Sequence, residues 1–252
     1  MKSDLFPSLS THADAPKAVY SSVDTWSVVC DFDGTISLAD TTDALLERFA
    51  DPAWHAIEDR WVAGEIGSAE CMQQQVALLD VCQEELDNWL DTVKIDPYFK
   101  AFVQLCEAHA IPLEIASDGI DYAIHRILRA HGLGHIPVVA NRLTVTGPRS
   151  YALSAPGPRC ITGAGVCKCV IIDQVRARGT QHVLYVGDGR SDFCVSEKVD
   201  LVAAKASLLT HCEQLDLPHK AFDHFADVAS ILTHVISVPR QPLRQDDVRV
   251  LA

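Results

Sequence analysis

The sequence predicts an α/β fold, with a parallel sheet interrupted by a helical insertion, on the basis of two patterns. Two largely apolar segments, 28–30 and 182–187, each run directly into an aspartate, Asp31 and Asp188. Residues 38–110 have instead a helical pattern almost throughout. In open α/β sheets, ligands bind beyond the carboxyl ends of the strands, so the aspartates are candidate functional residues.

The first part of the chain is expected to contain one strand followed by helices. Residues 1–25 are polar and lack the apolar centre of a secretory signal, so we interpret them as a loosely ordered extension. After the first strand, apolar residues recur at helical spacing, with Gly64 and Gly67 as breaks. The helices are expected within residues 43–49, 54–61, 69–79 and 84–90.

The second part returns to strands that alternate with helices. An apolar stretch at 113–116 ends in Ser117, and Lys168 stands directly ahead of a helical pattern. The other expected elements are a strand and hairpin at 138–147, a last strand at 201–204, a closing helix at 225–235 and a flexible polar tail at 239–252.

The first aspartate is one of a closely spaced pair. Asp31 and Asp33 are separated by one residue and are followed by Gly34. Two carboxylates at the end of a strand repel each other and are costly to hold together without a cation or a proton. Such an arrangement is typical of a site where the carboxylates take part in chemistry.

The segment Asp31–Thr35, with the sequence DFDGT, resembles motif I of the haloacid dehalogenase-like (HAD) phosphatases. Three further segments match the later motifs of that family in the same order: Ser117-Asp118-Gly119, then Lys168, then Gly187-Asp188-Gly189 with Asp192 four residues beyond the aspartate. An ordered match of four motifs is far more specific than one. The resemblance implies a Rossmann-like core with a parallel sheet and a helical C1 cap inserted between motifs I and II.

The resemblance implies a reaction through an aspartyl-phosphate. Asp31 would be the nucleophile, and Asp33 the general acid and then the base for the hydrolytic water. Mg²⁺ would be held by Asp31, by the main-chain carbonyl of Asp33 and by Asp188, since magnesium prefers hard oxygen ligands.

The remaining motif residues would bind the phosphate. Ser117 would contact a phosphate oxygen, helped by the N–H groups of Asp118 and Gly119 at a helix N-terminus. Lys168 would supply positive charge to the phosphate and the nucleophile. Asp192 would orient Lys168 or a metal-bound water from outside the ligand set. The family division places the HAD core at 26–37 and 111–238 and the cap at 38–110.

A narrower resemblance within the HAD phosphatases bears on the substrate. The chain resembles subclass IB, the phosphoserine phosphatase branch. Within it the chain is similar to the group of methionine-salvage 2-hydroxy-3-keto-5-methylthiopentenyl-1-phosphate phosphatases, through residues 40–43, 64–68 and 165–168. No arginine occurs between Trp61 and His125, and glutamines 73–75 stand where a cap arginine would bind the carboxylate of phosphoserine. Glutamine carries no charge, so a neutral keto or polyol phosphate is favoured. The alternative is that glutamines 73–75 merely form a solvated helix face.

Other functions remain open at this point. Phosphoserine phosphatase activity is one alternative, and phosphotransfer to another alcohol is a second, because it shares the aspartyl-phosphate. A non-catalytic regulatory protein or a phospho-receiver domain is an alternative of another class. The presence of both Asp31 and Asp33 disfavours a non-catalytic regulatory protein, and the insertion at 38–110 disfavours a phospho-receiver domain.

Composition narrows the partners and the compartment. The net charge of −13 argues against nucleic-acid binding, and no apolar run is long enough to span a membrane. Nine cysteines include the cluster Cys160, Cys167 and Cys169, but the ligand spacing typical of zinc is absent. The odd cysteine count and the polar N-terminus predict a cytoplasmic protein. Its expected partner, a small-molecule phosphate ester, is what the family resemblance implies.

Overall fold

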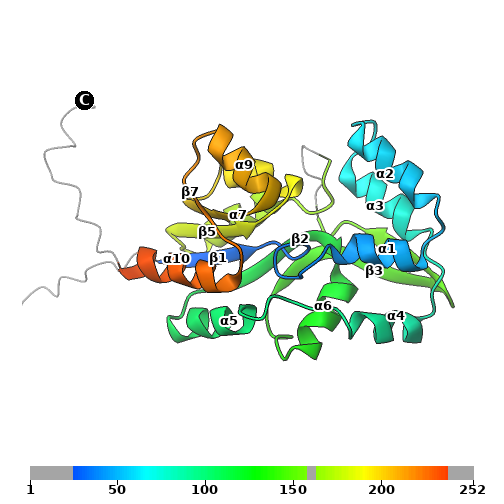
Figure 1. Ribbon diagram of the computed structural model, residues 1–252, viewed down its shortest axis with the longest axis horizontal. Helices are drawn as coiled ribbons and strands as arrows, with labels where there is room; N and C mark the ends of the chain where they lie inside the picture. The colour runs from blue at the N-terminus through cyan, green and yellow to red at the C-terminus, as the bar shows by residue number, and fades with distance from the viewer. Residues whose placement is uncertain (1–24, 158–162, 238–252) are drawn as a thin grey trace, which may run out of the picture.

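The computed structural model describes residues 25–157 and 163–237 (Figure 1). The predictions for the extension at 1–25, apart from Thr25, and for the tail at 239–252 therefore lie outside the described residues, as does Cys160. In the described part, no helix combines the length and the apolar character needed to cross a membrane.

A seven-stranded sheet with the order β4-β3-β2-β1-β5-β6-β7 forms the centre of the molecule. Every neighbouring pair is parallel except β3 and β4, which form an antiparallel hairpin, so the predicted α/β fold with a parallel sheet is confirmed. The strands are β1 (Trp26–Cys30), β2 (Leu113–Ile120), β3 (Val138–Gly147), β4 (Ser150–Ser154), β5 (His182–Gly187), β6 (Leu201–Ala204) and β7 (His219–Ala221).

Two details of the strands differ from the sequence prediction. Residues 201–204 are not the last strand, because β7 pairs with β6 in parallel; this strand has only three residues and carries too little apolar pattern to be detected. The second motif does not lie at a helix N-terminus. Instead β2 continues through Ser117 and Gly119 to Ile120, which pairs with Asn141 of β3, and the helix begins only at Asp121.

Helices cover both faces of the sheet (Figure 1). They are α1 (Thr41–Phe49), α2 (Trp54–Val62), α3 (Ser68–Val76), α4 (Gln83–Leu90), α5 (Phe99–Ala108), α6 (Asp121–Ala130), α7 (Lys168–Ala177), α8 (Phe193–Ser196), α9 (Ala206–Gln214) and α10 (Phe225–Ser237), with a 3₁₀ turn at Arg190–Asp192. The four helices predicted from the periodicity of residues 43–90 are all present, with ends that differ by up to three residues.

Successive residues of the central strands point to opposite faces of the sheet, as strand geometry requires. Val28 and Cys30 of β1 belong to an apolar core that includes residues of α5, α6 and α10. Val29, between them, belongs to a second core with residues of α7 and α9, as does Tyr185 of β5. Both faces of β1 and β5 are thus buried, which fixes the strands whose ends carry the aspartates.

The fifth helix packs on the sheet rather than with the helices that precede it. The rings of Phe99 and Phe102 lie 4.7 and 5.2 Å from the ring of Phe225 in α10. Asp96 is buried and accepts the N–H of Phe225. We therefore propose that the cap is narrower than residues 38–110 and consists of residues 38–95, with the helices α1 to α4.

Candidate active site

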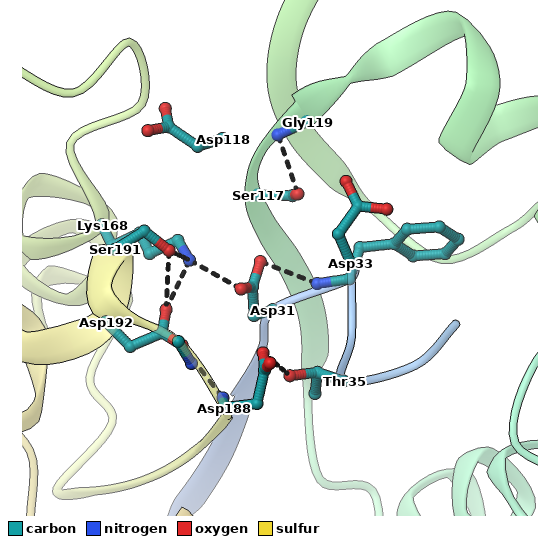
Figure 2. A network of polar contacts seen from close by, with 12 residues as sticks. Asp31, Asp33, Thr35, Ser117, Asp118, Gly119, Lys168, Asp188, Ser191 and Asp192 are labelled. Atoms are coloured by element: carbon teal, nitrogen blue, oxygen red, sulfur yellow. Dashed lines mark hydrogen bonds and ion pairs between the residues drawn. The ribbon is translucent and has the colours of Figure 1, made fainter. Parts of the chain in front are cut away.

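Asp31 and Asp188 meet because two neighbouring strands end at the same level. Cys30 of β1 pairs with Val186 of β5 in parallel register. Asp31 follows β1 directly and Asp188 follows β5 directly, so both carboxylates lie at the carboxyl edge of the sheet (Figure 2). The residues predicted from two distant segments of the sequence are thereby brought to one place.

Lys168 lies between two buried carboxylates (Figure 2). As the first residue of α7, it places its Nζ 3.1 Å from Asp31 Oδ2 and 2.5 Å from Asp192 Oδ1. All three side chains are at least nine-tenths buried. Burial alone would lower the pKa of Lys168, but Asp192 and Asp31 raise it above its usual range, so this lysine is charged at neutral pH.

Asp192 has donors on both oxygens. Oδ2 accepts the backbone N–H groups of Asp188 and Gly189, each at 3.1 Å, and Oδ1 accepts the hydroxyl of Tyr185 at 2.6 Å in addition to Lys168. Asp192 therefore fixes both the loop that carries Asp188 and the ammonium of Lys168. Its place beside Lys168 agrees with the sequence expectation, while its role stays a prediction.

Asp31 is held in a fixed orientation. Its Oδ1 accepts the backbone N–H of the next residue, Phe32, at 2.8 Å, and its Oδ2 faces Lys168. Burial raises the pKa of Asp31; Lys168 lowers it, while Asp192 and Asp188 raise it further. A cation beside Asp31 and Asp188 would reverse this balance and favour the ionised form of both.

Asp33 is bound by the start of α1. Its Oδ1 accepts the N–H of Thr41 at 2.9 Å, and its Oδ2 accepts the hydroxyl of Thr42 at 3.2 Å. Burial, with a smaller contribution from the charge of Asp40, raises the pKa of Asp33 to about 7. A carboxyl group with that pKa can both give and take a proton near neutrality.

Ser117, within β2 and three residues before its end, lies opposite Asp33 (Figure 2). Its Oγ is buried and accepts the N–H of Gly119 at 3.0 Å, which leaves its hydroxyl hydrogen to be donated. A side chain at position 119 would clash, because a Cβ there would lie 2.5 Å from Asp33 Oδ2 and 3.1 Å from Ser117 Oγ. Asp118, between them, turns its carboxylate away from Asp31 (Figure 2).

A second glycine permits the approach of Asp188 to the first motif. Gly34 has a φ of 68°, and a Cβ at this position would lie 2.6 Å from Asp188 Oδ2. The other oxygen of Asp188 accepts the hydroxyl of Thr35 at 2.8 Å. Burial raises the pKa of Asp188, and the bond from Thr35 opposes this shift.

One group of three side chains in the described residues is suited to holding a metal ion: Asp31, Asp188 and Asp192, with one carboxylate oxygen of each within 4.8 Å of the others. Hard oxygen donors of this kind fit Mg²⁺. Because Asp192 is already bound by Lys168, Tyr185 and two N–H groups, Asp31 and Asp188 are the better ligands.

Sequence reasoning missed the residues that support the aspartates. Thr35, Thr41 and Thr42 donate to Asp188 or Asp33, and Tyr185 donates to Asp192. Thr35 belongs to the DFDGT segment itself, and Thr41 and Thr42 follow it closely. Their place beside the motif could therefore have marked them as candidates for supporting the aspartates. Tyr185 gave none, since an aromatic residue in a buried strand is ordinary core.

The cap glutamines are only partly a solvated surface. Gln75 is 2% exposed, and its Nε2 donates to Glu58 at 2.8 Å. Gln74 accepts from Arg60 at 3.2 Å and donates to Glu70. The position expected for a carboxylate-binding arginine is thus filled by an amide that is already paired with an acid.

Of the cysteine cluster noted in the sequence, Cys169 lies with its Sγ 3.6 Å from the Sγ of Cys194.

Comparison with known proteins agrees with this geometry. The profile of the family described as haloacid dehalogenase-like hydrolase matches residues 28–197. A 2-hydroxy-3-keto-5-methylthiopentenyl-1-phosphate phosphatase of Brevibacillus brevis is 33% identical over 82% of this chain and 94% of its own length. One from Geobacillus thermodenitrificans is 32% identical over 81% of this chain and 93% of its own.

A solved structure shares the fold. The phospho-aspartyl intermediate analogue of a phosphoserine phosphatase superimposes with a TM-score of 0.63 and 19% identity, covering 84% of this chain and 98% of the other. At this identity the likeness concerns the fold alone. The narrower resemblance in sequence is instead to the phosphatases of the keto phosphate.

Proposed function

Because the chain belongs to the haloacid dehalogenase-like hydrolase family, we propose that it is a Mg²⁺-dependent phosphomonoester hydrolase that acts through a phosphorylated Asp31. The observation that carries this proposal is the position of Asp31, which lies at the end of β1 beside Lys168 and Asp188. The family match and the names of the relatives support the class of reaction.

Asp31 is the nucleophile of the proposed reaction. Its bonds to Lys168 and to the N–H of Phe32 fix the carboxylate, so that little freedom is lost when it attacks phosphorus. Lys168 also neutralises part of the charge of the incoming phosphate. Ser117 donates its hydroxyl hydrogen to a phosphate oxygen. Since the N–H of Gly119 already donates to Ser117, this hydroxyl is a better donor to phosphate than that N–H group.

Asp33 protonates the leaving alcohol and then takes a proton from the attacking water. With its pKa at about 7, it retains a proton in a substantial fraction of molecules at neutral pH. Thr41 and Thr42 hold its two oxygens. Both belong to the first turn of α1, so the cap contributes directly to the placement of the acid.

Mg²⁺ would be held by Asp31 and Asp188, with the main-chain carbonyl of Asp33 as a further ligand. When bound, the ion neutralises charge on the phosphate and relieves the repulsion between the carboxylates. Asp192 stays outside the ligand set and fixes Asp188 and Lys168 through their N–H groups.

The substrate is proposed to be the phosphate ester of a keto or polyol compound whose alcohol portion carries no charge, of the class that the relatives are named for. The pairing of Gln75 with Glu58 supports this choice, because the buried amide at this position carries no charge for a carboxylate. The guanidinium of Arg60 lies nearby but is bound to Gln74 and Glu65. Phosphoserine is the alternative substrate, and phosphotransfer to an alcohol the alternative reaction.

Release of inorganic phosphate from a panel of phosphate esters, measured with purified protein and Mg²⁺, tests the proposal. We expect turnover of keto and polyol phosphates and of an aryl phosphate. The Asp31→Asn variant, which cannot attack phosphorus, is the control and should be inactive while it keeps the folded structure, which circular dichroism checks. Substantial turnover by this variant would disprove the nucleophile assignment, and phosphorylated alcohol acceptors among the products would indicate a transferase.

A further inference from the structure

The side chain of Asp118 joins three segments that are distant in sequence. Its Oδ2 accepts the hydroxyl of Ser68 at 2.8 Å, and its Oδ1 accepts the N–H of Val166 at 2.9 Å. Its main-chain carbonyl accepts the side-chain amide of Asn141 at 2.5 Å. Asp118, which stands between Ser117 and Gly119, is therefore bound to the cap, to the loop before Lys168 and to β3.

On the cap side, this contact is part of a wider junction. Ser68 is the first residue of α3, and the N–H of the next residue, Ala69, donates to the carbonyl of Gly163 at 3.0 Å. Gly67 packs so closely on the same segment that a Cβ there would lie 2.9 Å from the Gly163 carbonyl oxygen. The start of α3 thus contacts the core at two backbone positions as well as at Asp118.

On the core side, the same carboxylate holds residues that precede the catalytic lysine. Val166 is two residues before Lys168, and its N–H is the donor to Asp118. A negative charge beside a site for a phosphate dianion is unfavourable unless it is turned aside and hydrogen-bonded. Figure 2 shows that it is turned aside, toward the segment of Lys168 and away from Asp31.

We propose that Asp118 is a positioning residue which links the seating of the cap, through Ser68, to the placement of Ser117 and Lys168, through its own backbone and through Val166. This role rests on the proposed phosphatase function, but the contacts themselves do not depend on it. When the cap is seated, Ser68 and Val166 hold the two carboxylate oxygens together. When it is not, Oδ2 loses its protein donor and the loop before Lys168 loses part of its support.

Steady-state kinetics on a keto or polyol phosphate tests the coupling through a double-mutant cycle. Ser68→Ala removes one hydrogen bond and should lower kcat/KM by about tenfold. Asp118→Ala should lower it further, and adding Ser68→Ala to that variant should cost no more, because both act through one contact. Asp118→Asn, whose amide can still accept from Val166 and donate to Ser68, should lose less than Asp118→Ala. Ser230→Ala, on the exposed face of α10, is the matched control and should behave as wild type.

Hydrogen exchange of backbone amides provides a readout that does not need turnover. In Ser68→Ala the N–H groups of both Ala69 and Val166 should exchange faster, because the contact to Ser68 supports both segments through Asp118, and in Asp118→Ala the N–H of Val166 should exchange faster still. The proposal is overturned if Ser68→Ala alters neither kcat/KM nor the exchange of Ala69, or if the two substitutions are additive. If no ester is hydrolysed by the wild type, the proposed function fails, and the exchange pattern still decides whether Asp118 links the two segments.

Discussion

The ammonium of Lys168 lies 2.5 Å from Asp192 Oδ1, and both side chains are withdrawn from solvent. This pair connects the start of α7 to the loop after β5, and so joins the lysine that faces Asp31 to the segment that carries Asp188. A buried charge pair of this kind is sensitive to the loss of either member, because the other is left with an unpaired charge.

Asp192→Asn should therefore destabilise the protein by about 3 kcal/mol, at the lower end of the range for a broken buried pair, since Lys168 retains Asp31 as a partner. Urea unfolding monitored by circular dichroism measures the loss. Asp91→Asn, which removes an exposed partner of Arg126, is the control and should change stability little. A similar midpoint for the two variants would contradict the importance of the buried pair.

Asp33→Asn should lower kcat by about 10²–10⁴-fold for alkyl phosphates, because the amide cannot protonate the leaving alcohol. The loss should be smaller for aryl phosphates, whose leaving group departs without a proton. Steady-state rates on a matched series of alkyl and aryl esters separate the two cases. An equal loss for both would rule out Asp33 as the general acid.

Substitution of the ligand Asp188 should change the dependence of activity on Mg²⁺, in the sense that more Mg²⁺ is needed. Activity should require Mg²⁺ and disappear in excess chelator, and Asp188→Ala should raise the Mg²⁺ concentration needed for half-maximal rate, since a carboxylate ligand is lost. Ca²⁺ should inhibit, because it favours more ligands and can draw Asp31 into bidentate coordination. A Mg²⁺ titration of each variant measures this, with the exposed Asp173→Ala as the control. Undiminished activity in chelator would refute the metal assignment.

The pH dependence of kcat/KM should reflect the protonation of the Asp33 carboxyl group. Because burial and the charge of Asp40 raise its pKa to about 7, the protonated form needed for leaving-group protonation is lost as pH rises through that value, and kcat/KM should fall. Asp40→Asn removes one charge that raises the pKa but keeps an efficient N-cap for α1, so the fall should move to lower pH. The kcat/KM profile between pH 5 and 9, measured at saturating Mg²⁺, gives the midpoints. A shift to higher pH in Asp40→Asn would contradict this account.

The cap should discriminate against phosphoserine. Its carboxylate would enter an acidic protein in which Gln75 is paired with Glu58 and carries no charge to replace the lost hydration. We expect kcat/KM for phosphoserine to be lower than that for a neutral keto or polyol phosphate by about tenfold or more. If phosphoserine matched or exceeded every neutral ester tested, the substrate assignment would move to the phosphoserine branch.

Local patterns in the sequence predicted the class of fold, and four ordered motifs that resemble those of a known family indicated the central residues of the site. A buried strand followed by an aspartate has a strong local signal, and the carboxyl ends of parallel strands lie on one edge of the sheet. The shared edge therefore explains why Asp31 and Asp188, which the motif resemblance assigned to one metal site, lie close together. The helices of residues 43–90 were predictable for a similar reason, because an amphipathic period is a local property.

The groups that support these residues follow from tertiary contacts, which the sequence patterns did not reveal. Tyr185 is an ordinary buried aromatic in the sequence, and its bond to Asp192 exists because β5 and the turn after it fold back on each other. The contact between Ser68 and Asp118 joins residues 50 positions apart, and the packing of α5 on Phe225 joins residues still further apart. Such long-range contacts depend on the relative placement of whole elements, which local propensity and spacing do not encode.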